Sequence, residues 1–527
     1  MFWLDRIYGQ IEESLKDKIA SGKTLLIRDE KTASGRVHVG SMRALALHAA
    51  IAERLSEAGI PHTFKYEIND MDPMDGLPVY LDAAIYQKEM GKPLYAIPSP
   101  DPKAASNYAE YFGGEFMAAI KEAGFSPEFY RASELYRAGK MDGAIRLALD
   151  RAAVVRKIYK EVSGAERPEG WFPLSVICEQ CGKMGTTKVS VWDGSLVTYT
   201  CEPKAVAWAE GCGHNGKVSP FGGKAKLPWK LDWPAKWLVV GVDIEGGGKD
   251  HYSKGGARDV ARRISEDVFD YPEPFGVANE FFLVGGKKMS SSKGQGSSAK
   301  EIVELVPPHI FRLALFGKDI NQQINFDPAG DTIPILFDQY DKLLEKYWSG
   351  VRDDDSRLLE YLYPGRRVSA RMFLPRFSQV AFVAQMPHLD FGDEMALLKG
   401  EALNDAEQKE AEERRRYALH WLELFAPEKF VFKLQETLSE AAVLSPVQKH
   451  ALALLADFIE GQATIPDGEA LHQKLHTLKE EAAIAPAELF SAIYLSFLGK
   501  SYGPKAGWFL SVLDRDFVLK RLKEASR

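Results

Sequence analysis

The beginning of the chain alternates short apolar strands with one amphipathic helix. Residues 24–28 and 62–68 are short runs rich in apolar positions, and each predicts a buried strand. Between them, apolar residues recur at helical spacing over 41–55, and Gly59 ends the pattern. A strand, a helix and a strand of this length form a βαβ unit, so the pattern predicts a parallel sheet.

Two polar segments follow the predicted strands. The loop 29–40 is rich in small residues, and the second strand leads into an acidic group at Asp70, Asp72 and Asp75. In parallel sheets, ligands bind beyond the carboxyl ends of the strands, which is where both segments fall. The three acids are either a solvated turn or part of a ligand-binding wall.

The middle of the chain is mixed in pattern, and its last part is helical. After a proline-rich connection within 91–135, alternating residues at 196–200 predict a strand. The sheet is expected to resume at 237–243 and again at 280–284. Beyond about residue 335, amphipathic helical patterns dominate to the end of the chain.

The composition is that of an ordinary globular protein. The chain has 527 residues, 45% apolar and 27% charged, with a formal net charge of −7. This length corresponds to about two to four domains. No run approaches the roughly 18 apolar residues of a membrane span, and the first residues lack the layout of a signal peptide, so we expect a reducing cytoplasm. The net negative charge argues against a protein that coats nucleic acid through its overall charge. It is compatible with binding of nucleic acid through a local basic face.

All four cysteines lie in one stretch, as Cys178-x-x-Cys181, Cys201 and Cys212. A Cys-x-x-Cys turn directs two thiolates to one point, and two more from another loop complete a tetrahedron around zinc. Buried free cysteines or a disulfide pair are the alternative, which the crowding into one stretch disfavours. We therefore expect one structural Zn²⁺ held by these four, with His214 as an alternative to one of the later two.

The small-residue loop closes with His38-x-Gly40 and opens the predicted helix. A phosphate can lie at such a point, against backbone N–H groups and the positive end of the helix dipole. Gly40 leaves room for a nucleotide, and His38 can donate a hydrogen bond to a phosphate. By itself, however, His-x-Gly at a helix start is usually only a turn.

Two further loops follow predicted strands. The segment 285–294 is small, hydroxylated and cationic, and such a loop can close over a triphosphate. The segment 246–251 combines glycines, which let the backbone approach a ligand, with Asp250, an acid suited to ribose hydroxyls. A flexible basic loop is the plain alternative for the first, but the three loops in this order are far more specific than any one.

Together the loops resemble the signatures of class I aminoacyl-tRNA synthetases. Residues 33–41 resemble the HIGH signature, and residues 288–292 resemble the KMSKS signature. The chain is most similar to the class I lysyl-tRNA synthetases, and the resemblance runs through nearly its whole length. The segments 232–237 and 248–251 separate that family from its glutamyl and cysteinyl relatives.

The resemblance implies an α/β fold and an ATP-dependent ligation of L-lysine to tRNA(Lys) through a lysyl-adenylate, with Mg²⁺ accompanying ATP. We expect a cytoplasmic enzyme with no membrane partner; the sequence leaves the oligomeric state open, with a monomer favoured. The implied parts are a Rossmann-type parallel-sheet catalytic domain in two halves (1–90 and 226–285), a connective insertion (91–225) with a zinc knuckle (178–214), a KMSKS loop and stem-contact segment (286–335), and an all-α anticodon-binding region (336–527).

The resemblance also implies roles residue by residue. His38 and Gly40 would hold the ATP phosphates, and Lys288 would stabilise pyrophosphate as it leaves, so these three are the expected catalytic residues. The further expected ATP-binding residues are Ser34, Gly35, Ser41, Asp250, Met289, Ser290 and Ser292. The expected lysine-binding residues are Glu30, Thr32, Trp229, His251 and Glu280, followed by the Asp70/Asp72 group.

Some positions depart from the family's pattern. In the two signatures, Ala33 replaces a proline, Ser41 replaces histidine or asparagine, and Ser291 replaces the second lysine, with Lys293 two residues later. In the expected lysine pocket, Glu30 stands in place of glycine and Asn279 in place of an aromatic residue, which leaves room for a changed amino-acid preference. Ala105 and Tyr111 replace the histidines of a second metal site, which supports a single zinc.

Several remaining side chains are interpreted as structural. We expect Trp233 and Trp237 to pack in a core. Residues 414–416 are expected to be an exposed helical charge run rather than a tRNA contact. Phe490, Tyr494 and Phe497 are expected to be mainly core, with one exposed aromatic there to stack an anticodon base. Two competing functions stay open: a small-molecule nucleotidyltransferase, and a non-catalytic synthetase relative that binds tRNA or nucleotide.

Overall fold

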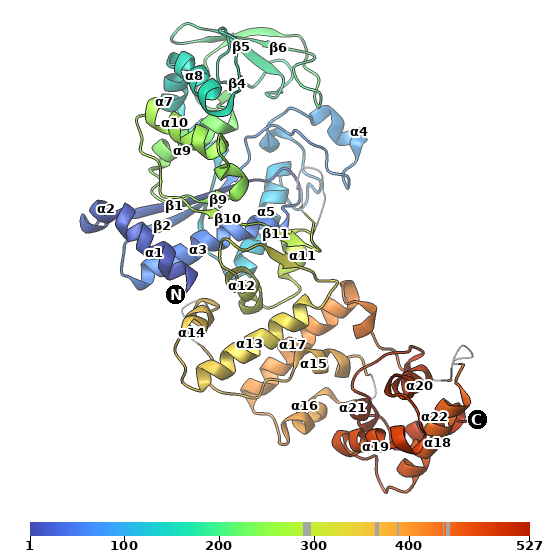
Figure 1. The fold of residues 1–527 in the computed structure, drawn as a ribbon. Coiled ribbons are helices and arrows are strands. Elements are labelled where there is room, and N and C mark those ends of the chain that lie inside the picture. The colour runs from blue at the N-terminus through green and yellow to red at the C-terminus, as the bar shows by residue number, and fades with distance from the viewer. Residues whose placement is uncertain (288–296, 364–367, 387–388, 436, 439–442) are drawn as a thin grey trace. The chain divides into compact units, whose positions relative to one another are not determined.

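The computed structural model describes residues 1–527 except 288–296, 364–367, 387–388, 436 and 439–442 (Figure 1). The chain divides into two compact units, the first formed by 1–327 and 343–369 and the second by 328–342 and 370–527. One boundary between the units, after residue 342, falls within the helix α13 (Thr332–Trp348).

The first unit is built on a parallel sheet. Strands β1 (Leu25–Thr32), β2 (His62–Asn69) and β3 (Glu128–Arg131) lie in the order β1-β2-β3, and all pairs are parallel. The helix α3 (Met42–Glu57) connects β1 to β2 and packs on both strands through a buried apolar face. The predicted βαβ unit is thus confirmed, with β1 four residues longer at its carboxyl end than expected, so that charged residues enter the strand.

The strand expected at 237–243 is wrong for most of its length. Residues Trp237–Val240 are the last turn of the helix α9 (Trp229–Val240), which ends at Gly241 in a left-handed conformation with φ 80°. Tryptophans four residues apart are the helical signal that the apolar run obscured. The extended chain begins only afterwards, and Ile244 bridges both Ile27 of β1 and Phe275 in parallel. Trp237 is fully buried, as expected for a core residue.

Smaller sheets surround this centre. Of the strand expected at 280–284, Phe282–Val284 forms β11, which pairs with β12 (Ile324–Phe326). Just before the expected segment, β10 (Ala278–Asn279) pairs with β9 (Gly247–Gly248). The cysteine-bearing module is antiparallel, and its middle strand confirms the strand expected at 196–200. Its strands are β5 (Thr187–Trp192), β6 (Val197–Cys201) and β7 (Asn215–Val218), with β4 (Ser175–Val176) and β8 (Ala225–Lys226) paired beside them.

The other elements of the first unit are helical. They are α1 (Trp3–Ser14), α2 (Lys16–Ala20), η1 (Val39–Ser41), α4 (Ala83–Tyr86), η2 (Gln87–Glu89), η3 (Leu94–Ala96), α5 (Tyr108–Glu122), α6 (Ala132–Arg137), α7 (Asp142–Asp150), α8 (Ala152–Ser163), η4 (Lys249–Tyr252), α10 (Ala257–Asp267), α11 (Ala299–Val303), α12 (Pro308–Phe316) and α14 (Asp354–Tyr361).

The second unit contains only helices among its described residues. They are α15 (Phe377–Val383), α16 (Phe391–Lys399), α17 (Asp405–Leu424), η5 (Glu428–Phe430), α18 (Pro446–Glu460), α19 (Gly468–Glu481), α20 (Pro486–Leu498), α21 (Ala506–Ser511) and α22 (Arg515–Ala525). Tyr494 and Phe497 are buried as expected, whereas Phe490 is half-buried and lines a cavity.

The expectation of an exposed charge run at 414–416 is wrong for Arg414. This side chain is buried, and its guanidinium pairs with Asp341 at 2.6 Å and Glu410 at 2.7 Å. Of the three, Arg414 is buried, Arg415 is half-buried and only Arg416 is exposed. An arginine can be buried when carboxylates pair with its guanidinium. A run of three arginines in the sequence does not reveal whether such partners exist.

Within the described residues, no single helix has the length and apolar composition to cross a membrane. The bent pair Gly468–Glu481 and Pro486–Leu498 passes that test only when its two helices are taken together.

Two adjacent glycines of α5 test how closely this helix packs on the sheet. A Cβ at Gly113 would lie 2.8 Å from Cγ2 of Ile68 on β2, whereas a Cβ at Gly114 would meet nothing within 4 Å. We expect Gly113→Ala to destabilise the protein by about 1–3 kcal/mol through overpacking. Gly114→Ala is the matched control and should stabilise it by up to about 1 kcal/mol, since alanine favours the helix. Chemical denaturation of both variants measures the difference, and two equal changes would show that α5 packs less closely.

Candidate functional site

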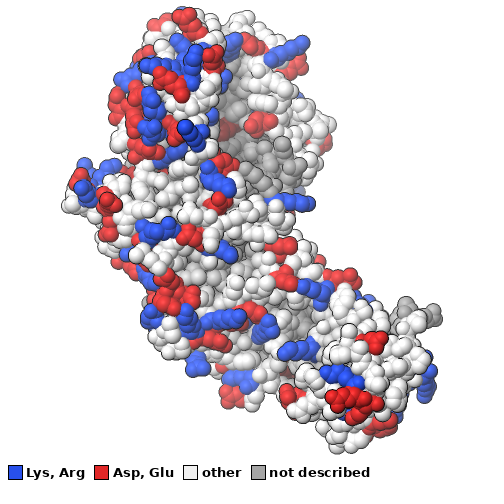
Figure 2. Space-filling view, in the orientation of Figure 1, with Lys and Arg blue, Asp and Glu red and all other residues white. Residues whose placement is uncertain are grey.

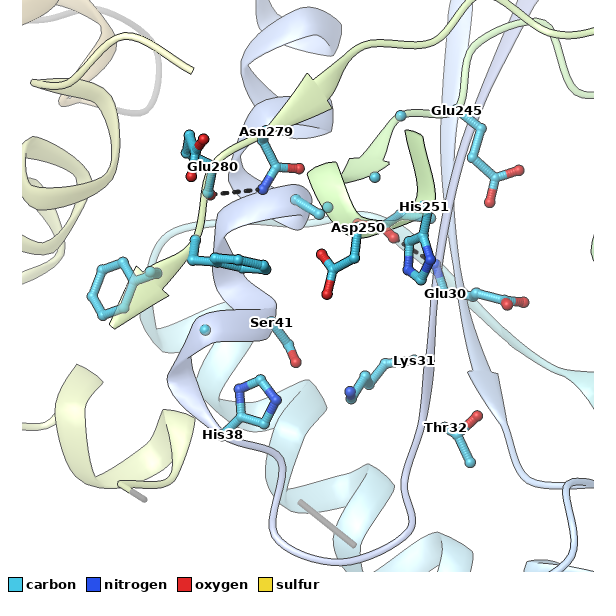
Figure 3. A pocket seen from close by; sticks show the side chains of 18 of the residues that line it. Glu30, Lys31, Thr32, His38, Ser41, Glu245, Asp250, His251, Asn279 and Glu280 are labelled. Atoms are coloured by element: carbon cyan, nitrogen blue, oxygen red, sulfur yellow. Dashed lines mark hydrogen bonds between the residues drawn. The ribbon is translucent and has the colours of Figure 1, made fainter. Parts of the chain in front are cut away.

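A cavity of about 440 Å³ opens at the carboxyl end of β1 (Figure 3). Its walls come from the end of β1, the loop leading into α3, the first turns of α9, residues 245–251 and residues 279–283. The position agrees with the expectation for a parallel sheet. Among the expected site residues, those that line the cavity are Glu30, Thr32, Ser34, His38, Gly40, Ser41, Trp229, Asp250, His251 and Glu280.

The other expected site residues are not part of this lining. Gly35 lies in the adjoining loop with φ 154°, beside Ser34, whose carbonyl accepts a hydrogen bond from the Tyr108 hydroxyl. Lys288, Met289, Ser290 and Ser292, together with Ser291 and Lys293, lie outside the described residues.

Gly40 lets the start of α3 approach the backbone at Phe282 closely. A Cβ at this position would lie 3.0 Å from Nδ1 of His38 and 3.1 Å from the carbonyl oxygen of Phe282. Neither η1 nor α3 has a side-chain cap, and Ser41 and Ala44 face the cavity. The positive end of a helix is therefore turned toward the cavity beside the His38 side chain, an arrangement suited to an anion.

One fully buried arginine organises the acidic wall of the cavity. The Arg28 guanidinium donates hydrogen bonds to Glu67 at 2.8 Å, to Glu245 at 2.6 Å, to Glu30 and to the Tyr130 hydroxyl. Since four acceptors surround it, its charge is compensated although it is removed from water. Glu30 and Glu245 belong to the cavity wall, so Arg28 fixes that wall from behind.

Two buried lysines extend this set of ion pairs, which we call the Arg28 network. Lys236 pairs with Glu67 and, at 2.7 Å, with Asp232, and Lys226 pairs with Asp232 at 2.8 Å and Asp72 at 2.9 Å. The network thus joins β1 and β2 to α9 and β8. Each lysine has a raised pKa, because the neighbouring carboxylates outweigh the effect of burial.

Glu30 is the carboxylate of this network that reaches the cavity. Burial raises the pKa of Glu30, but Arg28 and Lys236 outweigh this effect and lower it to about 2. The Trp229 indole N–H lies 3.3 Å from the second carboxylate oxygen. Trp229 stacks on Trp233 at 5.7 Å and contacts His251 at 5.4 Å, so Glu30 carries a fixed negative charge beside an aromatic wall. Trp233, expected only as core, therefore also lines the cavity.

The acids after β2 are neither a simple solvated turn nor part of the cavity lining. Asp70 is buried and accepts hydrogen bonds from the backbone and the hydroxyl of Ser133. Asp72 accepts one from the Thr32 hydroxyl at 2.6 Å and pairs with Lys226. Asp72 thus holds the end of β1, Asp70 holds the start of α6, and only Asp75 is exposed, as a solvated turn predicts.

A buried histidine that sequence reasoning missed positions the glycine loop. Nε2 of His48 accepts a hydrogen bond from the Gly246 N–H at 2.8 Å, so Nδ1 carries the proton and faces Asp29 at 3.2 Å. Asp29 and Gly246 both line the cavity. His48 lies in the middle of α3 among apolar residues, and nothing in the local pattern distinguishes it from a core histidine.

The opposite edge of the cavity carries Glu280 and Asn279. The Glu280 carboxylate pairs with Lys249 at 2.7 Å. The Asn279 amide donates to the Glu280 carbonyl at 3.1 Å, while its buried oxygen has no hydrogen-bond partner within the described chain. Lys31, also missed from the sequence, lines the cavity as well. Four charged residues in succession at the end of a buried strand, Arg28 to Lys31, were the available signal.

The four cysteines converge in the antiparallel module. All four sulfur atoms lie within 4.8 Å of one another, with 3.7 Å between Cys178 and Cys212 and between Cys181 and Cys201. Zn–S bonds of about 2.3 Å in a tetrahedron place sulfurs about 3.8 Å apart, so the thiol set fits zinc. His214 is not part of this group, and its ring contacts Tyr199.

Comparison with known proteins gives one consistent result. The model of the family "tRNA synthetases class I (K)" matches residues 1–363. The Lysine–tRNA ligase of Methanosarcina barkeri is 35% identical over 99% of this chain and 97% of its own, and that of Archaeoglobus fulgidus is 30% identical over the whole of both chains. Among solved structures, a glutamate tRNA ligase from Elizabethkingia meningosepticum aligns with 96% of this chain and 99% of its own, at 12% identity and a TM-score of 0.44.

The charge of Glu30 can be tested through stability. Its folded-state pKa of about 2 lies below the usual 4.5, so its contribution is present above pH 4.5 and is lost as the pH falls toward 2. We expect Glu30→Gln to be less stable than wild type by about 2 kcal/mol at pH 7, with the gap narrowing from pH 4.5 to pH 3. The exposed Glu13→Gln serves as control, and thermal melting measures both. A gap that is constant between pH 7 and pH 3 would contradict the assignment.

Proposed function

The chain belongs to the class I lysyl-tRNA synthetase family, and we propose that it uses ATP to join L-lysine to tRNA(Lys) through a lysyl-adenylate. The observation that carries the proposal is the cavity at the end of β1. It combines an anion-binding helix start at His38 and Gly40 with a fixed carboxylate and aromatic wall at Glu30 and Trp229.

The helix start is proposed to bind ATP. His38, Gly40 and Ser41, with Ser34 and Gly35 in the same loop, would hold the phosphates, whose negative charge suits the positive end of α3. Asp250 would bind the ribose hydroxyls, because it follows the glycines of β9, which let the backbone lie close to a ligand. Lys288, with Met289, Ser290 and Ser292, would stabilise the departing pyrophosphate, and Mg²⁺ would accompany ATP.

The acidic wall is proposed to bind lysine. A carboxylate beside stacked indole rings suits an ammonium group on a long apolar stem, through ion pairing and cation–π attraction. Glu30 and Trp229 are the centre of this wall, and Thr32, His251 and Glu280 surround it. Because Arg28 holds Glu30 ionised to about pH 2, this charge is present at every physiological pH.

The reaction needs positioning more than covalent catalysis by the protein. The lysine carboxylate attacks the α-phosphorus of ATP, the bond to the bridging oxygen breaks, and pyrophosphate leaves. A hydroxyl of the terminal tRNA ribose then attacks the lysyl carbonyl, and AMP leaves. Both steps are accelerated by holding the reacting groups together and by stabilising negative charge. Full-length similarity to lysine–tRNA ligases favours this function over a small-molecule nucleotidyltransferase or a non-catalytic relative.

The remaining parts of the chain are proposed to serve tRNA. The proposed boundaries are a catalytic domain at 1–90 and 226–285, an insertion at 91–225, a stem-contact segment at 286–335 and an anticodon-binding region at 336–527. In the second unit, a cavity of about 800 Å³ combines aromatic side chains such as Trp508 and Phe490 with the cations Arg376, Lys429 and Lys505. Such a site suits a stacked base and its phosphate.

Local rather than bulk charge is proposed to guide the tRNA. On the visible face of the protein, basic and acidic side chains are interspersed (Figure 2), in keeping with the net charge of −7. We propose that the enzyme acts as a cytoplasmic monomer.

The first test concerns the helix start. We expect His38→Ala to lower lysine-dependent ATP–pyrophosphate exchange, measured with total tRNA present, by about 100-fold, as for loss of a hydrogen bond to developing phosphate charge. His62→Ala removes a histidine outside the cavity and should keep full activity. Undiminished exchange in a folded His38→Ala protein would refute the proposed role.

The second test concerns the cysteines, for which we propose one structural zinc. We expect wild type to contain about one Zn²⁺ per chain and Cys178→Ser to lose it, with a lower melting temperature, because metal binding stabilises such a module. His214→Ala should retain the metal. Elemental analysis and thermal melting measure both properties, and zinc loss in His214→Ala but not in Cys178→Ser would overturn the ligand set.

A further inference from the structure

Lys31 stands in the catalytic cavity without a role in the function described above. It is the seventh residue of β1, between Glu30 and Thr32, and it lines the cavity. Its side chain extends from the strand into the space bounded by His38, Ser41 and Asp250 (Figure 3). Glu30 and Thr32 leave the strand on the other side, so Lys31 faces the helix start rather than the aromatic wall.

The charge of Lys31 is exceptional for its surroundings. Within the described part of the lining, Lys31 is the only lysine or arginine, whereas five side chains are acidic: Asp29, Glu30, Glu245, Asp250 and Glu280. Arg28 pairs with Glu30 and Glu245, and Lys249 pairs with Glu280, so these cations outside the lining are engaged by the acids and do not serve the triphosphate of ATP. Lys31 is the described cation placed to do so.

The acids nearest to Lys31 in the chain are engaged elsewhere. Glu30 pairs with Arg28, and Asp29 faces His48. The Lys31 ammonium itself makes no ion pair or hydrogen bond with any residue that the structure describes, although Asp29 and Glu30 favour its charge from a distance. Burial outweighs these two carboxylates and lowers the pKa of Lys31 below its usual value, so the ammonium gains more from a bound anion here than it would in water.

We propose that Lys31 is a further catalytic residue, whose ammonium binds the α-phosphate oxygens of ATP and stabilises their charge while lysyl-adenylate forms. This inference rests on the proposed function and assigns to the reaction a group outside its two signature loops. The α-phosphate is favoured over the outer phosphates because Lys31 lies on β1, beside Glu30, at the junction of the proposed lysine wall and the proposed phosphate site.

The role of Lys31 requires no proton transfer. The lysine carboxylate oxygen bonds to the α-phosphorus, and the bond from this phosphorus to the bridging oxygen breaks. The electron pair of the broken bond leaves with pyrophosphate. During this exchange the non-bridging oxygens of the α-phosphate carry negative charge. The ammonium stays protonated and paired with those oxygens throughout. A fixed cation at this point lowers the barrier because it is already oriented before the reaction begins.

The test uses three variants of the full-length enzyme. Lys31→Met removes the charge at nearly constant length, Lys31→Arg keeps it, and Lys23→Met makes the same charge change at an exposed position just before β1. We expect Lys31→Met to lower kcat for lysine-dependent ATP–pyrophosphate exchange by about 100-fold, Lys31→Arg to recover most of it, and Lys23→Met to match wild type. Thermal melting checks that each variant is folded.

Two ligands separate the phosphate from the lysine carboxylate as the partner of Lys31. Lysinol adenylate keeps the phosphate and has no carboxylate, whereas free lysine has the carboxylate and no phosphate. The inference requires Lys31→Met to raise the inhibition constant of lysinol adenylate by about 10-fold or more while leaving the KM for lysine unchanged. A raised KM for lysine with unchanged inhibition would assign Lys31 to the carboxylate and overturn the inference.

Failure of this inference is distinguishable from failure of the proposed function. If wild type exchanges pyrophosphate with lysine and folded Lys31→Met does so equally well, Lys31 is not catalytic although the function stands. If wild type itself shows no lysine-dependent exchange, the proposed function fails first. Should Lys31→Met not fold, the neutral but polar Lys31→Gln takes its place: a raised inhibition constant for lysinol adenylate in Lys31→Gln but not in Lys23→Met supports the inference, and equal inhibition constants refute it.

Discussion

The burial of Arg28 is the constraint on which the site depends. A guanidinium removed from water must be surrounded by acceptors, and Glu30, Glu67, Glu245 and Tyr130 satisfy this requirement from four strands or extended segments. The same contacts fix the carboxyl end of β1, against which the cavity forms. Removing any one of these carboxylates leaves an arginine with fewer partners, so the geometry of the cavity and the stability of the sheet are linked.

Strand β1 also separates the two electrostatic halves of the cavity. On one side of β1, Glu30 offers a fixed negative charge beside Trp229, which suits an ammonium. On the other side, the uncapped start of α3 and the Lys31 side chain offer positive potential, which suits phosphate. Adjacent residues of a strand point to opposite faces, so a single strand can present both charges. The two substrates of an adenylation reaction require this combination, an amine on one and a triphosphate on the other.

Much of this arrangement could be predicted from the sequence, because its signals are local. The βαβ unit, the His38-x-Gly40 loop and the cysteine group each rest on spacing within a short segment, and the structure brings their residues together. One failure was local: the apolar run at Trp237–Val240 has the composition of a strand and obscured the four-residue spacing of the tryptophans, which indicates a helix. The other failures were non-local. Arg414, Asp70 and His48 look like surface or core residues until their distant partners, Asp341, Ser133 and Gly246, are known.

The most direct measurement of the central claim is ATP–pyrophosphate exchange by the wild-type enzyme against each of the twenty amino acids, with total tRNA present. A cavity whose amino-acid wall is a fixed carboxylate beside stacked indoles should accept lysine and exclude acidic and short apolar amino acids. The account predicts exchange with lysine, well above that with every other amino acid. Exchange with a different amino acid would contradict the assignment of Glu30 and Trp229 to a lysine pocket, and exchange with none would contradict the catalytic function itself.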